Sequence, residues 1–305
     1  MSLFLKNFKT IFLLLFFFYI GPALSQEAAC IADLVPGWVN QLKNVAQILA
    51  IISYVVGVFF LIKAIMKIKE HTETKGQVKI SVPIFHFAAS ALLLSLPSIM
   101  ELGVQAVIGM NATTGVSLDG NISNQVCSSS SSTAPGSVGD MFANFKPSAL
   151  ALYEFAFYAA WVIGVSLMIT AIFRFAQLGS NPQMHPKTPI INFVVGAFLI
   201  AMTSTLNLVG QSIATGGWDS SRNPGSILVN SPRSIGAQVD IIQQGILAFL
   251  MLIGIIAVIR GWLLLNQMAM GKEGVLGRGL THIFGGVMLI NLHNFGPIIA
   301  KSLGW

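Results

Sequence analysis

Polar side chains near the C-terminal end of the chain are the residues best placed to do chemistry. His282 and His293 are eleven positions apart, about three helical turns, which puts both rings on one face of a helix. Asn291 and Asn294 lie close to the second histidine. Polar groups at membrane depth usually line a proton or ion route or contact a neighbouring helix. We favour interhelical hydrogen bonding, because no acidic residue lies within the apolar runs after Glu154.

Other signatures of chemistry are weaker. His86 lies near an expected helix start, where an interfacial role is predicted, and the histidines lack metal-ligand spacing or cysteine companions. The glycines of one loop (Gly271, Gly274, Gly277 and Gly279) lack the Gly-Lys-Ser/Thr of a nucleotide-binding loop. A serine or cysteine nucleophile with an orienting base is not identifiable. The sequence therefore predicts no enzyme, no metal and no cofactor.

Composition places the chain in lipid. Of 305 residues, 54% are hydrophobic and 9% are charged, and the mean hydropathy is +0.75. Soluble domains carry about 25% charged residues, so this composition cannot supply a water-facing surface. The net charge of +6 would favour nucleic acid as a partner in a soluble protein. Here the basic residues flank apolar runs and set topology, so we expect membrane lipid as a partner and no direct nucleic-acid binding.

Residues 1–25 have the layout of a cleavable signal peptide. Lys6 and Lys9 precede an apolar stretch, and Ala23-Leu24-Ser25 supplies small residues where a signal peptidase cuts. The alternative is an uncleaved anchor helix.

The rest of the chain alternates between apolar runs and polar linkers. Six runs of about 18 to 25 residues are long enough to cross a bilayer as helices. Their continuous apolar character excludes barrel strands, which would alternate. The predicted fold is an all-α membrane protein with six transmembrane helices in three hairpins. Its expected segments are an exported N-terminal segment (26–44), hairpin 1 (45–103), a serine-rich periplasmic loop (104–148), hairpin 2 (149–210), a periplasmic loop (211–240) and hairpin 3 (241–303).

Basic residues set the expected orientation. The linkers 63–79, 174–188 and 260–278 hold ten of the seventeen lysines and arginines, so they are expected in the cytoplasm. The protein is then a multi-pass protein of a bacterial inner membrane with periplasmic mature termini. The basic turns could bind lipid phosphates or a cytoplasmic partner such as an ATPase, but topology anchoring is the favoured interpretation. Their residues are Lys67, Lys69, Arg174, Lys272 and Arg278.

Both cysteines fall on the expected periplasmic, oxidising side. Cys30 lies in the N-terminal segment and Cys127 in the serine-rich loop. A disulfide between them is a candidate, and two unpaired thiols are the alternative.

Small residues recur at helical spacing in the three hairpins. Each first helix has a glycine followed seven positions later by another small residue on the same face. These pairs are Gly57 and Ala64, Gly164 and Ala171, and Gly254 and Gly261. A further glycine follows in each hairpin (Gly103, Gly210 and Gly296), at spacings of 46, 46 and 42 residues from the first. Such residues let helix backbones approach closely in lipid. We interpret the hairpins as parallel repeats that pack on neighbours, although chance is the alternative in a chain with 29 glycines.

Two hairpins also resemble a known family. The segments AVIRGWLLLNQ and GVLGRGLTHIFGGVMLIN resemble the closing hairpin of the DotE/IcmC family, which is related to the conjugation protein TraQ. The segments SYVVGVFFLIKAIMKIKEH and PSIMELG are similar to that family's opening hairpin. The specific positions are Ile259-Arg260-Gly261, Gly277-Arg278-Gly279, Thr281-His282-Ile283 and Gly285-Gly286. The signal peptide, the serine-rich loop and hairpin 2 do not map onto the family.

The resemblance implies a structural, non-enzymatic role. Family members are inner-membrane components of type IVB secretion systems, the Dot/Icm and IncI-type conjugation machines, which move protein or DNA out of a bacterium. The expected partners are other secretion-system subunits and further copies of the chain. The alternative function is a small-solute or ion channel or transporter that uses the face of His282 and His293.

Overall fold

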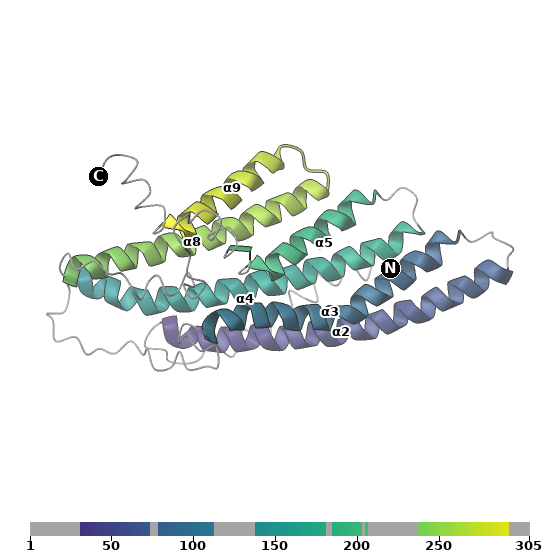
Figure 1. The fold of residues 1–305 in the computed structure, drawn as a ribbon, viewed down its shortest axis with the longest axis horizontal. Coiled ribbons are helices and arrows are strands. Elements are labelled where there is room, and N and C mark those ends of the chain that lie inside the picture. Colours follow the sequence, from purple (N-terminus) through teal and green to yellow (C-terminus); the bar gives the residue numbers. More distant parts are fainter. Residues whose placement is uncertain are drawn as a thin grey trace.

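The computed structural model describes residues 31–73, 79–112, 138–180, 185–202, 205–206 and 237–292. This described part is helical, and its long helices form three antiparallel pairs that lie side by side (Figure 1). The helices are α2 (Ile31–Glu73), α3 (Ser81–Ala112), α4 (Val138–Leu178), α5 (Lys187–Ile200), α8 (Ala237–Ala269) and α9 (Val275–Ile290). The pairs are α2 with α3, α4 with α5, and α8 with α9. The predicted all-α class is confirmed.

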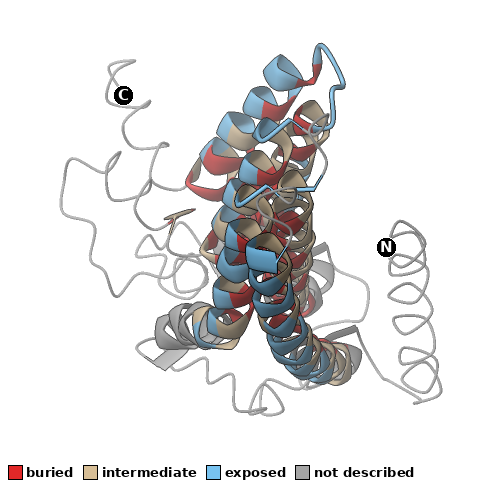
Figure 2. Ribbon diagram, turned by 90° about the vertical axis from the view of Figure 1, so that its right-hand side faces the viewer, coloured by how far each residue is buried: buried red, intermediate tan, exposed pale blue. Residues whose placement is uncertain are grey.

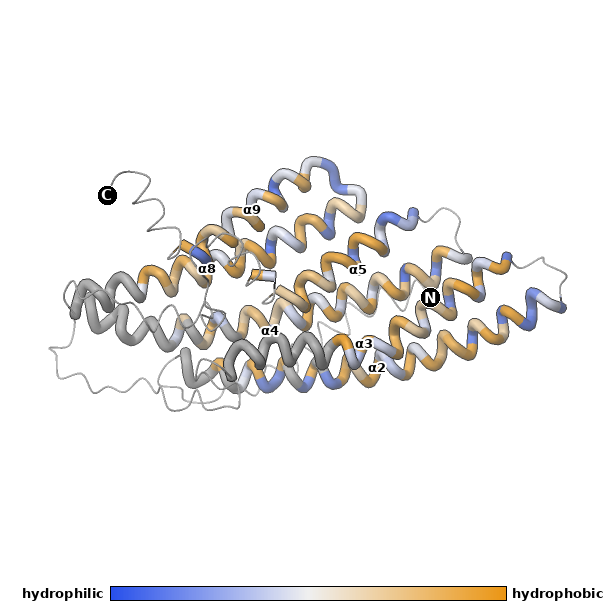
Figure 3. The backbone as a smooth tube through the Cα atoms, in the orientation of Figure 1, coloured by the Kyte–Doolittle hydropathy of each residue, from blue (hydrophilic) through white to orange (hydrophobic). Residues whose placement is uncertain are grey.

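Four helical segments are long and apolar enough to cross a membrane: Gly37–Glu73, Ser81–Ile99, Ala151–Leu178 and Gly245–Ala269. In lipid, a helix satisfies every backbone hydrogen bond within itself, which is why continuous apolar runs form helices there. The other two runs form the shorter apolar helices α5 and α9 within the described residues. Figure 3 shows the apolar colours along the helices and polar colours where consecutive helices of a pair meet.

Several helices extend beyond the apolar runs that predicted them. The segment 26–44 was expected to precede the first membrane run, but α2 already begins at Ile31. Likewise, α3 continues to Ala112 and α4 begins at Val138, so parts of the expected loop 104–148 are helical. At its other end, α2 includes Lys67 and Lys69 of the basic linker, which pair with acidic residues one turn ahead. The signal peptide lies outside the described residues.

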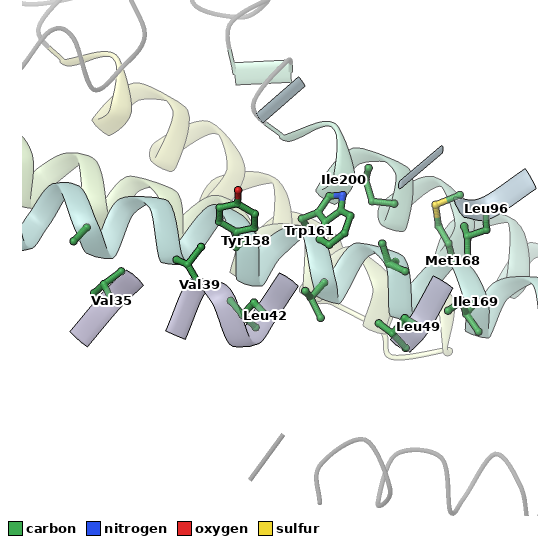
Figure 4. Close-up of a cluster of buried hydrophobic side chains, with 13 residues drawn as sticks. Val35, Val39, Leu42, Leu49, Leu96, Tyr158, Trp161, Met168, Ile169 and Ile200 are labelled. Atoms are coloured by element: carbon green, nitrogen blue, oxygen red, sulfur yellow. The ribbon is translucent and has the colours of Figure 1, made fainter. Parts of the chain in front are cut away.

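Contact with α4 explains the early start of α2. Val35, Val39 and Leu42 are buried in one cluster with Tyr158 and Trp161 of α4 (Figure 4). The polar residues between them hid this apolar face from a reading of continuous runs, but its i, i+4, i+7 spacing is that of a helix packed on a partner.

Helix α4 lies at the centre of the bundle. It packs against α2 and α3 on one side and against α5 and α8 on the other. Large α4 side chains such as Val165, Met168 and Ile169 are almost fully buried. In Figure 2 the buried positions face the interior of the bundle, and the exposed positions lie on its outer surfaces. The first and third pairs therefore flank the second.

The α8–α9 turn is closed by glycines. Beyond the end of α8, the Gly271 N–H donates to the Met268 carbonyl and the Lys272 N–H to the Gln267 carbonyl, the two bonds of a Schellman motif. Gly271 has φ +87° and Gly274, at the start of α9, has φ +72°. Both values lie in the left-handed region that glycine adopts without strain. This turn sends α9 back along α8.

Candidate functional site

The closest backbone approach within the second pair is at Gly164 of α4 and Gly196 of α5. A Cβ atom on Gly164 would lie 2.7 Å from the carbonyl oxygen of Gly196, and one on Gly196 would lie 2.8 Å from that of Gly164. Ile200 and Met168 close the contact above and below, because they also lie within about 3 Å of these positions. Neither glycine can be replaced without movement of backbone. The crossing therefore fixes how close the two helices lie.

The third pair has the same arrangement at Gly254 and Gly286. A Cβ on Gly254 would be 2.8 Å from the Gly286 carbonyl oxygen, and one on Gly286 would be 2.5 Å from that of Gly254. Ile290 and Val258 occupy the places that Ile200 and Met168 hold in the second pair. A second contact follows two turns along α8, where a Cβ on Gly261 would lie 2.8 Å from the carbonyl oxygen of Gly279.

In the first pair, Gly57 of α2 faces α3 more loosely. A Cβ on Gly57 would lie 3.1 to 3.2 Å from side-chain atoms of Leu93 and Leu94. Leu93 stands 36 residues after Gly57, just as Ile200 follows Gly164 and Ile290 follows Gly254. We call Gly57, Gly164 and Gly254 the crossing glycines.

The partners of the crossing glycines on the second helices were not predicted. A small residue follows each crossing glycine by 32 positions, namely Ala89, Gly196 and Gly286. That spacing was the available signal, but the sequence analysis paired the crossing glycines with Gly103, Gly210 and Gly296. Gly210 and Gly296 lie outside the described residues. Of the small residues predicted seven positions on, Ala64 and Ala171 are fully buried and Gly261 contacts α9.

Comparisons of the chain with protein families, with curated proteins and with solved structures find no match.

The polar residues of α9 bond within their own helix. His282 Nδ1 lies 2.8 Å from the Arg278 carbonyl oxygen, and Asn291 Nδ2 donates to the Val287 carbonyl at 2.9 Å. The interhelical hydrogen bonds favoured for these two side chains are therefore not the bonds they make here. His86, expected at an interface, is instead 4% exposed and lies edge-on to Phe60 of α2. His293 and Asn294 lie outside the described residues.

The residues that carry the family resemblance divide between two sides of the third pair. Gly261, Gly279 and Gly286 are buried at the α8–α9 contact. The remaining polar and small positions face outward: Arg260, Gly277, Arg278, Thr281 and Gly285 are exposed. The Thr281 hydroxyl donates to the Gly277 carbonyl one turn earlier. A Cβ on Gly277 or Gly285 would meet nothing within 4 Å, so these two glycines leave an open surface on α9.

The basic turn residues lie at one end of the bundle, where the two helices of each pair meet (Figure 3). Lys67 pairs with Glu70, Lys69 lies 3.6 Å from Glu73, and the exposed Lys272 lies 3.4 Å from the Gln267 side chain. Arg174 lines a cavity of about 750 Å³ between the end of α4, the start of α5 and the end of α8. Its lining includes His185, Lys187, Thr188, Met268 and Met270.

One hydrogen bond joins the second and third pairs at this end. The Thr188 hydroxyl, in the first turn of α5, donates to the carbonyl of Ala269, the last residue of α8, at 3.0 Å. The final carbonyls of a helix have no partner within it, so this bond satisfies one of them. Within the described residues, no three His, Cys, Asp or Glu side chains gather as a metal site. Cys30 and Cys127 lie outside that part of the chain.

Proposed function

We propose that the chain is a structural, non-enzymatic subunit of a bacterial inner-membrane machine that exports protein or DNA, a type IVB secretion or conjugation apparatus. The proposal includes six membrane spans, with α5 and α9 as the inner parts of the fourth and sixth. It also includes three parallel hairpin repeats, a cleaved signal peptide and periplasmic termini. The membrane part is supported by the four long apolar helices.

The repeated crossing is the observation that carries the structural role. Gly164 with Gly196, and Gly254 with Gly286, bring backbone against backbone at the same spacing in two pairs. Lipid gives no hydrophobic drive to helix association, so close packing of small residues is the main way for helices to hold together there. A chain built from such pairs is suited to a rigid membrane scaffold. The secretion apparatus is proposed from the resemblance of the first and third hairpins.

Gene deletion tests the proposal. In a bacterium that carries the chain, an in-frame deletion should abolish effector or plasmid transfer, and the wild-type gene should restore it. The Gly286→Ile variant should fail to restore transfer, because its side chain has no room against Gly254. The matched Gly285→Ile variant, whose position faces open space, should restore it. Normal transfer in the deletion strain would refute the proposal.

The same strains separate the alternatives. His282 bonds to its own helix, so His282→Ala should leave transfer intact, and purified protein in liposomes should carry no solute. Solute flux that disappears in His282→Ala while transfer continues would favour a channel or transporter instead. Charge reversal at Lys67, Lys69 and Arg278 tests an ATPase anchor. Unchanged assembly of the apparatus in that variant would count against the anchor.

A further inference from the structure

The three helix pairs meet each other in a head-to-tail order. Both helices of the first pair, α2 and α3, pack on the first helix of the second, α4. Both helices of the second pair, α4 and α5, pack on the first helix of the third, α8. Such an interface joins two different faces, so it leaves one face unused at each end of a series. Here the unused faces belong to α2 and to the α8–α9 pair.

The contact points of the two junctions occupy the same positions counted from the crossing glycines. At the first junction, Gly179 lies against the start of α3, where its Cβ would be 3.1 Å from the Ser81 carbonyl oxygen. At the second, the Ala269 carbonyl accepts the Thr188 hydroxyl. Gly179 and Ala269 both stand 15 residues after their crossing glycine, and Ser81 and Thr188 both stand 24 after theirs. The unused equivalents are Thr72, at the end of α2, and Arg278, at the start of α9.

The apolar faces follow the same rule. Positions 1, 5 and 8 after the crossing glycine lie on one helix face. In α4 they are Val165, Ile169 and Ile172, which are 0 to 1% exposed in clusters shared with α2 or α3. In α8 they are Ile255, Ile259 and Trp262, which pack in a cluster with the second pair. Trp262 also stacks on Phe198 of α5 at 4.4 Å.

In α2 the same positions are uncovered. Val58, Ile62 and Ile65 are 37%, 52% and 58% exposed. Lipid could cover apolar side chains at no cost, so exposure alone identifies no partner. The argument is that α4 and α8 each bury this face against a preceding pair, and α2 has no preceding pair in its own chain.

We propose that the α8–α9 pair of one copy receives the α2 face of a second copy, so that the chain assembles head to tail. Charge favours this register, because Arg278 would lie beside Glu73. Arg278 is exposed and pairs with no carboxylate in the described residues, and the Glu73 side chain stays 64% exposed beside Lys69. On α9, Gly277 and Gly285 leave space for a close approach. The assembly rests on the arrangement of the helices and not on the secretion assignment, so either can fail alone.

Site-directed cross-linking tests the register. The native Cys30 and Cys127 are replaced by serine, and two differently tagged copies of the full chain are co-expressed, one with Thr72→Cys and one with Arg278→Cys. Oxidation in native membranes should join the two tags, since equivalent residues within the chain are in contact and a disulfide needs Cα atoms within about 7 Å. Each variant alone should give no dimer. A chain that carries both changes should give a ladder of multimers.

Matched controls make each outcome decisive. Phe284→Cys, 67% exposed on another face of α9, should not cross-link to Thr72→Cys. An intrachain bond between Thr188→Cys and Ala269→Cys reports that the fold is kept. Dimers from either variant alone would show a twofold interface and overturn the proposal. Only monomer in cross-linking and in native mass spectrometry, or capture of a different protein at Arg278→Cys without self-capture, would also overturn it.

Discussion

The ring of Phe60 on α2 lies edge-on to the ring of Phe173 on α4, with centroids 5.4 Å apart. This contact joins the first helix pair to the second. Phe60 is 1% exposed, whereas its neighbour Phe59 points away from the bundle and is 58% exposed. The two residues share type and depth, so they form a natural experiment on packing against another helix.

We expect Phe60→Ala to lower the free energy of unfolding by about 3 kcal/mol, because it leaves a cavity between α2, α3 and α4. Phe59→Ala should change it little, since that side chain leaves one apolar environment for a similar one. Unfolding of the purified protein in mixed micelles measures both values. Equal losses in the two variants would contradict the described packing.

Adjacent glycines test the third pair. Gly286→Ala should destabilise the protein by about 1–3 kcal/mol, because the added methyl group would lie 2.5 Å from the Gly254 carbonyl oxygen. Gly285→Ala should be neutral or mildly stabilising, since its methyl group meets open space and alanine favours the helix. Thermal unfolding followed by circular dichroism distinguishes the two. A harmless Gly286→Ala would mean that the helices are not held at this distance.

Two threonines at the same end of the bundle test the bond between pairs. Thr188→Val removes the donor to the Ala269 carbonyl and should cost about 1 kcal/mol. Thr281→Val removes only a bond to the Gly277 carbonyl of its own exposed turn and should cost less. Micelle unfolding gives both values. A double-mutant cycle of Thr188→Val with Trp262→Ala should show coupling, because both residues hold the second pair to the third.

The turn ends should share one side of the membrane. In Figure 1 the ends of α2, α4 and α8 lie toward the same end of the bundle. Single cysteines at Thr72, Ser180 and Lys272 should therefore all resist an impermeant maleimide in intact spheroplasts and react after lysis. Labelling of one position but not the others in intact spheroplasts would contradict the arrangement of the pairs. Labelling of all three would place these ends in the periplasm and reverse the proposed orientation.

Much of the fold follows from local signals. The continuous apolar runs predicted helices because lipid leaves a backbone no other partner, and Gly271 and Gly274 indicated a tight turn at the end of α8. The crossing glycines were also visible, because small residues seven positions apart share a helix face. Their partners Gly196 and Gly286 were not assigned, since a spacing of 32 residues means a contact only once the length of the intervening turn is known.

The sequence by itself determined the helical class, the apolar stretches and the residues able to approach closely, because these depend on composition and on the helical period. Only the tertiary structure decided that α4 lies at the centre, that α2 begins as early as Ile31, and that His86 is buried beside Phe60. These features depend on which helix lies next to which. Contacts between residues far apart in the chain set that choice, and no local pattern encodes it.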